Sequence, residues 1–198
     1  MNTDTALAWL RGFAAAVDEH AAALTDLDRP IGDSDHGVNL QRGTRAVLDA
    51  LDAQAPATPG AVLTTAGSTL VSTVGGASGP LFGTLLRRAG KSLGETGDAD
   101  APALAAALRA GLDGVVKLGG AQVGDATLVD ALTPAVEALE AGRSVAEAAD
   151  AAEQGAASTE PLVARKGRAS YLGERGAGHR DPGAQSVVLL LRALAAVS

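Results

Sequence analysis

The chain has 198 residues, of which 46% are hydrophobic, 20% charged and 2% aromatic, and this composition suits one globular domain rather than a disordered chain. The formal net charge of −7 repels polyanions at long range, so we expect neither nucleic acid nor an anionic membrane surface as a partner. The absence of cysteine excludes disulfides, thiolate nucleophiles and zinc–thiolate sites.

The chain shows no pattern that predicts secretion or membrane insertion. Residues 1–5 lack the basic region and apolar segment of a secretory signal. The longest apolar run, Val187–Leu191, is far shorter than the ~18 residues that span a bilayer. We therefore expect a cytoplasmic protein.

The distribution of apolar residues predicts an all-α fold with about eight helices in a single domain, residues 1–198. Alanine is abundant and favours helices, apolar positions recur at spacings of three and four, and no alternating strand pattern is present. In chain order, the expected helices cover residues 4–24, 36–51, 61–74, 79–93 and 100–118, followed by helices that begin near Thr127, Ser144 and Asp181.

Three local signals refine this prediction. Ser144 and Glu147 have the spacing of a capping box at the start of a helix. The segment Ala184–Val197 is apolar on nearly all sides, which is typical of a helix inside a bundle. Residues 94–100 are rich in glycine and polar residues and are expected to form a flexible connector.

Three carboxylates lie close together between the first two expected helices, at Asp28, Asp33 and Asp35. Pro30 and Gly32 interrupt regular helix between them and allow the chain to fold back, so the acids can converge. Hard cations such as Mg²⁺ prefer carboxylate and phosphate oxygens. The free amides of the helix that follows would offer an adjacent seat for anionic oxygens. The alternative is that Asp33 or Asp35 only caps this helix while Asp28 is a solvated acid.

A glycine-rich turn over residues 73–80 opens another helix. Its glycines allow backbone amides to approach a phosphate, and Ser78 can donate a hydrogen bond or cap the helix. No P-loop lysine follows, so an ordinary interhelical turn explains the pattern equally well. The glycine-rich segment 119–128 is, on its own, only a loop before a helix.

The segment 164–183 concentrates positive charge in an otherwise acidic chain. It holds five of the 16 basic residues, namely Arg165, Lys166, Arg168, Arg175 and Arg180. Guanidinium groups bind phosphate with two hydrogen bonds, so the segment is a candidate phosphate contact. The alternative is a solvated basic loop whose side chains pair with neighbouring acids.

Taken together, these stretches resemble the nucleotide-binding domain of dihydroxyacetone kinases, most closely its free-standing L-subunit form. The resemblance runs from about Leu27 to Gly183 and rests on four motifs: Ile-Gly-Asp-x-Asp-His-Gly-x-Asn, Gly-Gly-Ala-Ser-Gly-Pro-x-x-Gly, Gly-Asp-x-Thr-x-x-Asp-Ala, and Ala-Arg-Lys-Gly-Arg-Ala-Ser-Tyr-Leu-Gly-Glu-Arg with a trailing His-x-Asp-Pro-Gly. It implies an antiparallel eight-helix barrel that holds a nucleotide, ADP or ATP, with two Mg²⁺ ions at one end.

The resemblance also implies roles for individual residues. Asp28, Asp33 and Asp35 match the metal ligands of the family. The residues that match its nucleotide contacts are His36, Gly37, Val38, Asn39, Ala77, Ser78, Gly119, Leu128, Arg168, Asp181, Pro182 and Gly183. Val123 and Leu128 depart from the family, which often has proline and methionine there, and these differences affect the surroundings of the adenine rather than the metal site.

The function implied by the resemblance is that of a kinase subunit without a catalytic nucleophile of its own. Bound ADP would accept a phosphoryl group from a phosphohistidine on the M subunit of the phosphotransferase system. The resulting ATP would donate that group to dihydroxyacetone on a K subunit. Phosphoryl transfer of this kind depends mainly on positioning and charge neutralisation.

Three alternatives remain open from the sequence. The chain could use ATP directly, with a related ketose or polyol as acceptor. It could be a nucleotide-binding module that regulates a partner without catalysing transfer. It could also be a helical protein whose acids are only caps and whose arginines lie only on the surface.

Overall fold

The computed structural model describes residues 1–198 and is almost entirely helical. Eight α-helices and one 3-10 helix follow one another: α1 (Thr3–Asp28), α2 (His36–Gln54), α3 (Pro59–Thr73), α4 (Ser78–Leu93), α5 (Ala101–Gly119), α6 (Leu128–Glu140), α7 (Val145–Ser158), η1 (Arg168–Gly176) and α8 (Pro182–Ala195). The only β-type pairing is an isolated bridge between Asn2 and Asp98. The prediction of an all-α fold is confirmed.

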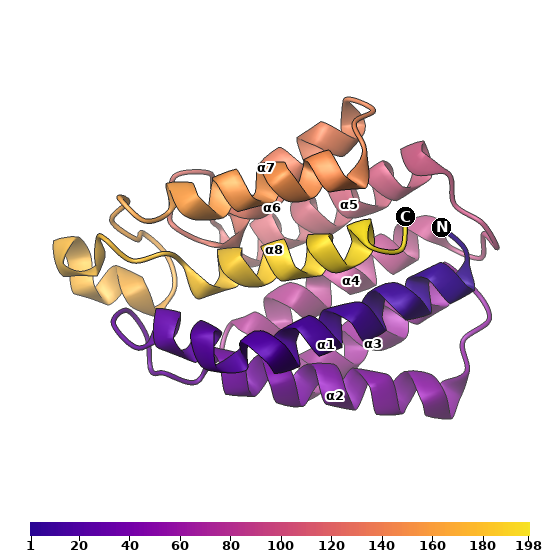
Figure 1. Ribbon diagram of the computed structural model, residues 1–198, viewed down its shortest axis with the longest axis horizontal. Helices are drawn as coiled ribbons and strands as arrows, with labels where there is room; N and C mark the ends of the chain where they lie inside the picture. Colours follow the sequence, from indigo (N-terminus) through magenta and orange to yellow (C-terminus); the bar gives the residue numbers. More distant parts are fainter.

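The α-helices form a closed antiparallel barrel (Figure 1). Each helix packs against the next one in chain order, and α8 closes the ring against α1. Because the chain reverses direction at each connection, the even-numbered helices all begin at the same end, the end that carries η1. The two chain termini lie towards the opposite end. No helix is both long enough and apolar enough to cross a membrane.

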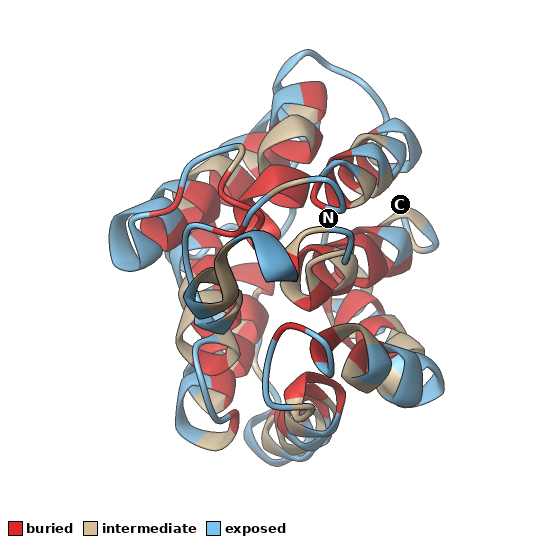
Figure 2. Cartoon of the chain, turned by 90° about the vertical axis from the view of Figure 1, so that its left-hand side faces the viewer, coloured by how far each residue is buried: buried red, intermediate tan, exposed pale blue.

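The core fills the inside of this ring. Figure 2 looks along the barrel from the η1 end and shows buried residues facing inward and exposed residues facing outward. One continuous cluster of buried side chains, mostly leucine and alanine, runs through the molecule. The indole nitrogen of Trp9 donates a 2.8 Å hydrogen bond to the carbonyl of Leu190 and so ties α1 to the nearly all-buried α8. The predicted position of this last helix inside the bundle is confirmed.

Helix ends follow the sequence signals closely, with two differences. The capping box of Ser144 and Glu147 is present, and Thr127 forms a second one with Asp130. The first helix, however, continues to Asp28, so this residue is the end of a helix rather than part of a loop. The basic segment also contains the short 3-10 helix η1, because the backbone of Gly167 and Gly173 departs from helical geometry and interrupts a regular helix.

Helices α1 and α2 lie very close together at Gly37. A Cβ atom at this position would lie 2.0 Å from the carbonyl oxygen of Ala21 and 2.6 Å from Oγ1 of Thr25. Real Cβ atoms do not come so close to backbone, so a larger residue would push the two helices apart. The glycine of the Asp-His-Gly motif is therefore required by helix packing.

We expect Gly37→Ala to destabilise the protein by about 1–3 kcal/mol, the usual range for overpacking in a closely packed site. Chemical unfolding followed by circular dichroism measures this free energy. Gly97→Ala is the matched control, because no atom lies within 4 Å of its added Cβ. Equal unfolding free energies for the two variants would contradict the packing role of Gly37.

Candidate functional site

A cavity of about 370 Å³ lies at the end of the barrel where the even-numbered helices begin. Its volume falls within the range of roughly 300–1,000 Å³ that is usual for small-molecule sites. Of the predicted site residues, those that line it are Asp28, Asp33, Asp35, His36, Asn39, Ala77, Ser78, Gly119, Leu128, Arg168, Asp181, Pro182 and Gly183. The two others, Gly37 and Val38, do not line it: Gly37 packs against α1, and Val38 is 55% exposed on the outside.

The three predicted carboxylates converge at the edge of this cavity. One oxygen from each of Asp28, Asp33 and Asp35 lies within 4.8 Å of the other two. Asp28 is buried, and its Oδ2 accepts hydrogen bonds from the amides of Asp35 at 3.0 Å and His36 at 3.3 Å. Asp28 thus caps α2 from the preceding helix, whereas Asp35 stands at the N-cap position without a side-chain cap bond.

The connection between α1 and α2 is shaped to allow this convergence. A Cβ atom at Gly32 would lie 1.9 Å from Oδ1 of Asp28, so only glycine lets the loop close over this carboxylate. Ser34 adopts a left-handed backbone with φ of 61°, which turns the chain back towards α1. The two features place Asp33 and Asp35 beside Asp28 as the sequence predicted.

His36 links three helices beneath the carboxylates. It is buried, its Nε2 lies 2.8 Å from Oγ of Ser186 on α8, and its Nδ1 lies 3.0 Å from Oγ of Ser78 on α4. The hydroxyl of Ser186 donates to the carbonyl of Pro182, so it accepts from Nε2. Burial lowers the pKa of His36 against the opposing effect of Asp28 and Asp35. Both ring nitrogens are therefore used inside the protein, and His36 fixes the hydroxyl of Ser78 at the cavity.

In the glycine turn before α4, small residues line the cavity and no side chain caps the start of the helix. Ala77 is the N-cap residue and makes no side-chain cap bond, while the hydroxyl of Ser78 is directed to His36. As at every helix start, the first amides of α4 have no intrahelical partners. Here the N-cap side chain does not bond to them either. Gly75, Gly76 and Ala77 line the cavity here, and their small size leaves those amides accessible.

The loop between α5 and α6 is held by two buried aspartates. The carboxylate of Asp130 accepts hydrogen bonds from the amides of Gly124 at 2.6 Å and Thr127 at 2.8 Å. Asp125 accepts from the amide of Gln122 at 2.9 Å. The two acids of the Gly-Asp-x-Thr-x-x-Asp-Ala motif therefore fix the loop, and they present its end and Leu128 to the cavity.

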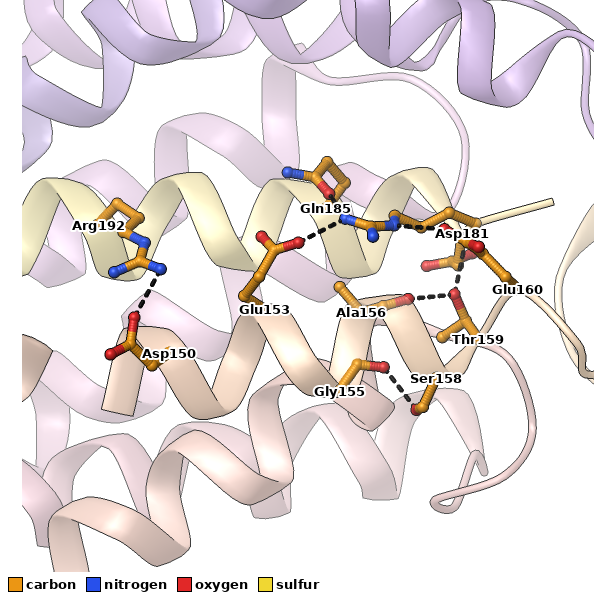
Figure 3. A network of polar contacts seen from close by, with 11 residues as sticks. Asp150, Glu153, Gly155, Ala156, Ser158, Thr159, Glu160, Asp181, Gln185 and Arg192 are labelled. Atoms are coloured by element: carbon orange, nitrogen blue, oxygen red, sulfur yellow. Dashed lines mark hydrogen bonds and ion pairs between the residues drawn. The ribbon is translucent and has the colours of Figure 1, made fainter. Parts of the chain in front are cut away.

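The basic segment contributes to the site in part. Arg168 reaches the acidic cluster and forms a 3.0 Å ion pair with Asp33, and Lys166 also lines the cavity. Arg180 points elsewhere: its guanidinium binds Glu153 at 2.7 Å and Glu160 at 3.1 Å. These two acids, labelled in Figure 3, lie in the C-terminal part of α7 and just beyond it. The prediction of a single positive patch is thus wrong for Arg180, because these neighbouring acids neutralise it.

Asp181 lies where α8 begins, and burial raises its pKa to about 7. The nearby carboxylates of Asp130 and Asp28 raise this pKa further, while hydrogen bonds from the amides of Ala184 and Gly183 act against them. The backbone of Asp181 is anchored to Thr159, as Figure 3 shows, by a 3.0 Å hydrogen bond to its hydroxyl. The cavity therefore contains a fourth carboxyl group that is easily protonated.

Sequence reasoning missed the apolar wall of the cavity. Leu81, Val115 and Leu118 line it together with Ala121 and Val129. Leu118 remains 54% exposed at the end of α5, where it borders the cavity. The cavity thus combines an apolar side, an acidic cluster and the free amides of several helix starts. Such a site fits a ligand that has a flat apolar part and an anionic part neutralised by cations.

Comparison with known proteins identifies the family. The family model described as the DAK2 domain matches residues 30–196 of the chain. The chain belongs to the DAK2 domain family.

Two relatives match this DAK2 domain over nearly its whole length. The PEP-dependent dihydroxyacetone kinase 1, ADP-binding subunit DhaL, of Listeria innocua is 44% identical over 96% of the chain and 94% of the relative. The PEP-dependent dihydroxyacetone kinase, ADP-binding subunit DhaL, of Escherichia coli is 45% identical over 94% of the chain and 93% of the relative.

A solved structure shares the fold. The crystal structure of the dihydroxyacetone kinase from C. freundii in complex with AMP-PNP and Mg²⁺ superimposes with a TM-score of 0.77 at 28% identity. The match covers the whole of this DAK2 domain but only 34% of that kinase chain. The chain thus spans about a third of that longer kinase, and the antiparallel barrel implied by the sequence resemblance is confirmed.

The raised pKa of Asp181 predicts a pH dependence of the stability of this DAK2 domain. Between pH 3.8 and about 7 the folded chain retains a proton that the unfolded chain has released, so stability falls as the pH rises through this window, by at most about 1.4 kcal/mol per pH unit. Asp181→Asn removes the charge and keeps a side-chain oxygen for the cap of α8. We expect a flatter stability profile for this variant between pH 4 and 7.

Thermal unfolding in the presence of a chelator at several pH values measures this effect. Asp113→Asn, on the exposed face of α5, serves as the control and is expected to follow the wild-type profile. An unchanged slope in Asp181→Asn would show that the carboxyl group of Asp181 carries no extra proton in the folded protein.

Proposed function

We propose that this chain is the ADP-binding subunit of a dihydroxyacetone kinase, and that it holds ADP together with two Mg²⁺ ions. The observation that carries the proposal is the convergence of three carboxylates with four helix N-termini around one cavity. The names of the two bacterial relatives and the AMP-PNP and Mg²⁺ in the related crystal structure support it.

The donor set of the acidic cluster fits magnesium. Asp28, Asp33 and Asp35 supply only carboxylate oxygens, the ligands that Mg²⁺ prefers, and their spacing leaves room for water and phosphate as further ligands. Oδ2 of Asp28 is held by two amides, so its direction is set before a cation binds. Bound Mg²⁺ would neutralise phosphate charge and act as a Lewis acid.

The rest of the cavity fits a nucleoside diphosphate. The starts of α2, α4, α6 and α8 direct their positive dipole ends to this end of the barrel, and the start of α4 has no side-chain cap, which favours phosphate oxygens there. Arg168, which pairs with Asp33, and Lys166, whose ammonium lies near Gly120, add two cationic side chains to the lining. Leu81 and Val115 of the apolar wall would pack against the purine, together with Leu128 and beside Gly119.

The chain itself supplies positioning rather than a nucleophile. It contains no cysteine, and the hydroxyl of Ser78 is already bonded to His36. In the proposed reaction a phosphohistidine of a phosphotransferase-system M subunit gives its phosphoryl group to the terminal oxygen of ADP. The ATP formed then gives that group to a hydroxyl of dihydroxyacetone on a K subunit, where the hydroxyl proton is lost. ADP is regenerated and acts as a retained cofactor.

Loss of Asp33 tests the metal assignment. We expect Asp33→Asn to weaken the Mg²⁺-dependent binding of ADP by about a hundredfold, which corresponds to about 2.7 kcal/mol, because one anionic ligand is lost. The helical circular dichroism should be unchanged, since the exposed ion pair of Asp33 with Arg168 contributes little to stability. Isothermal titration calorimetry with and without Mg²⁺ measures the affinity.

Asp26→Asn is the matched control for this experiment. Asp26 lies nearby on α1, its partner is the exposed Arg29, and it does not line the cavity. We expect this variant to bind Mg²⁺ and ADP like the wild-type protein. Undiminished affinity in Asp33→Asn would refute the metal site.

A further inference from the structure

A second groove, of about 880 Å³, runs over the outer face of α3, α4 and α5. Its charged side chains are mostly cationic. Arg87, Arg88 and Lys91 on α4 and Lys117 on α5 line it, and Glu95 is the one acid among the lining residues. We call this surface the basic groove. In a chain with 23 acidic and 16 basic residues, this is a marked local excess of positive charge.

The four cations of the basic groove have no partner in the protein. All four are exposed, and no ion pair or side-chain hydrogen bond engages them. Most other arginines form ion pairs with nearby acids, as is the case for Arg11, Arg29, Arg45, Arg109, Arg165, Arg168, Arg180 and Arg192. The positive potential of the groove is therefore available to a ligand.

The shape of the basic groove favours a protein surface over a small anion. Its lining extends along α4 from Thr84 to Gly94, about 15 Å at 1.5 Å per residue, which is longer than one phosphate or carboxylate. Only Ala61 and Leu118 among the lining residues are apolar, whereas small-molecule sites are mostly apolar. A row of exposed cations along a mostly polar groove is suited to clustered carboxylates on a partner.

The basic groove adjoins the nucleotide cavity. Leu118 lines both, and Lys117 directly precedes it at the end of α5. The groove thus runs from the edge of the cavity at Leu118 towards the other end of the barrel, and a protein that covers it would reach the cavity at its Lys117 end. Nucleic acid fits less well, because the net charge of −7 opposes it and no aromatic side chain lines the groove for base stacking.

We propose that the basic groove docks an acidic surface of the phosphohistidine-bearing donor protein. This inference rests on the proposed function. Charge distinguishes the donor from the acceptor: the donor brings an anionic phosphoryl group to the cavity, whereas dihydroxyacetone is neutral. During transfer the bond between phosphorus and the histidine nitrogen breaks, a bond to the terminal oxygen of ADP forms, and the nitrogen keeps the electron pair and takes a proton from water. The groove steers the donor and takes no part in these bonds.

Charge reversal in the groove tests this proposal by separating the two half-reactions. The variant Arg87→Glu/Lys91→Glu is compared with the wild-type protein in phosphoryl transfer from the purified phosphorylated donor to bound ADP. We expect kcat/KM for the donor to fall at least about tenfold at low ionic strength, and the difference to shrink as salt is added. Mg²⁺-ADP affinity and transfer from ATP to dihydroxyacetone on the K subunit should remain unchanged.

The control is Arg143→Glu, which reverses an exposed and unpaired cation between α6 and α7. It should leave both half-reactions as in the wild-type protein. Equal donor kinetics in the groove variant and the control would overturn the proposal, and so would an equal loss in both half-reactions. If the wild-type protein binds Mg²⁺-ADP but takes no phosphate from the donor, the donor step of the proposed function fails and the proposal fails with it.

Discussion

The site depends on one consequence of the up-and-down topology, which is that all the even-numbered helices begin at the same end of the barrel. Their first amides and the positive ends of their dipoles converge there and favour an anion. The three carboxylates at the same end favour a cation. A metal–phosphate ligand satisfies both requirements at once, because the cations stand between the two sets of negative oxygens. The antiparallel barrel thus supplies the helix starts, and the three acidic side chains complete the site.

Asp28 connects this site with the folding of the protein. As the last residue of α1 it caps α2 through two amides with one carboxylate oxygen, and Gly32 closes over the other. The same contacts that join the first two helices therefore position the carboxylate that we propose as a metal ligand. His36 extends the connection to α4 and α8 through Ser78 and Ser186. A small set of buried polar contacts in this way joins four helices around the cavity.

The sequence predicted those features that depend on local chemistry. The acids around Pro30 and Gly32 could be expected to converge, because the intervening residues interrupt a helix. Contacts across the barrel could not be predicted: His36 meets Ser186 only because α8 closes the ring, 150 residues later. The place of Gly37 in the motif suggested a phosphate contact. The structure shows that glycine is needed there because a larger residue would collide with Ala21 on α1. The apolar wall was missed for the same reason, since Leu81 and Val115 meet only in the folded chain.

The proposed metal site can be tested with a crystal structure of the protein grown with ADP and with Mn²⁺ in place of Mg²⁺. Anomalous scattering locates manganese without ambiguity. We expect two manganese peaks bound by the carboxylates of Asp28, Asp33 and Asp35, with the diphosphate between them and the start of α4. Manganese elsewhere, with these carboxylates turned to solvent, would refute the metal site.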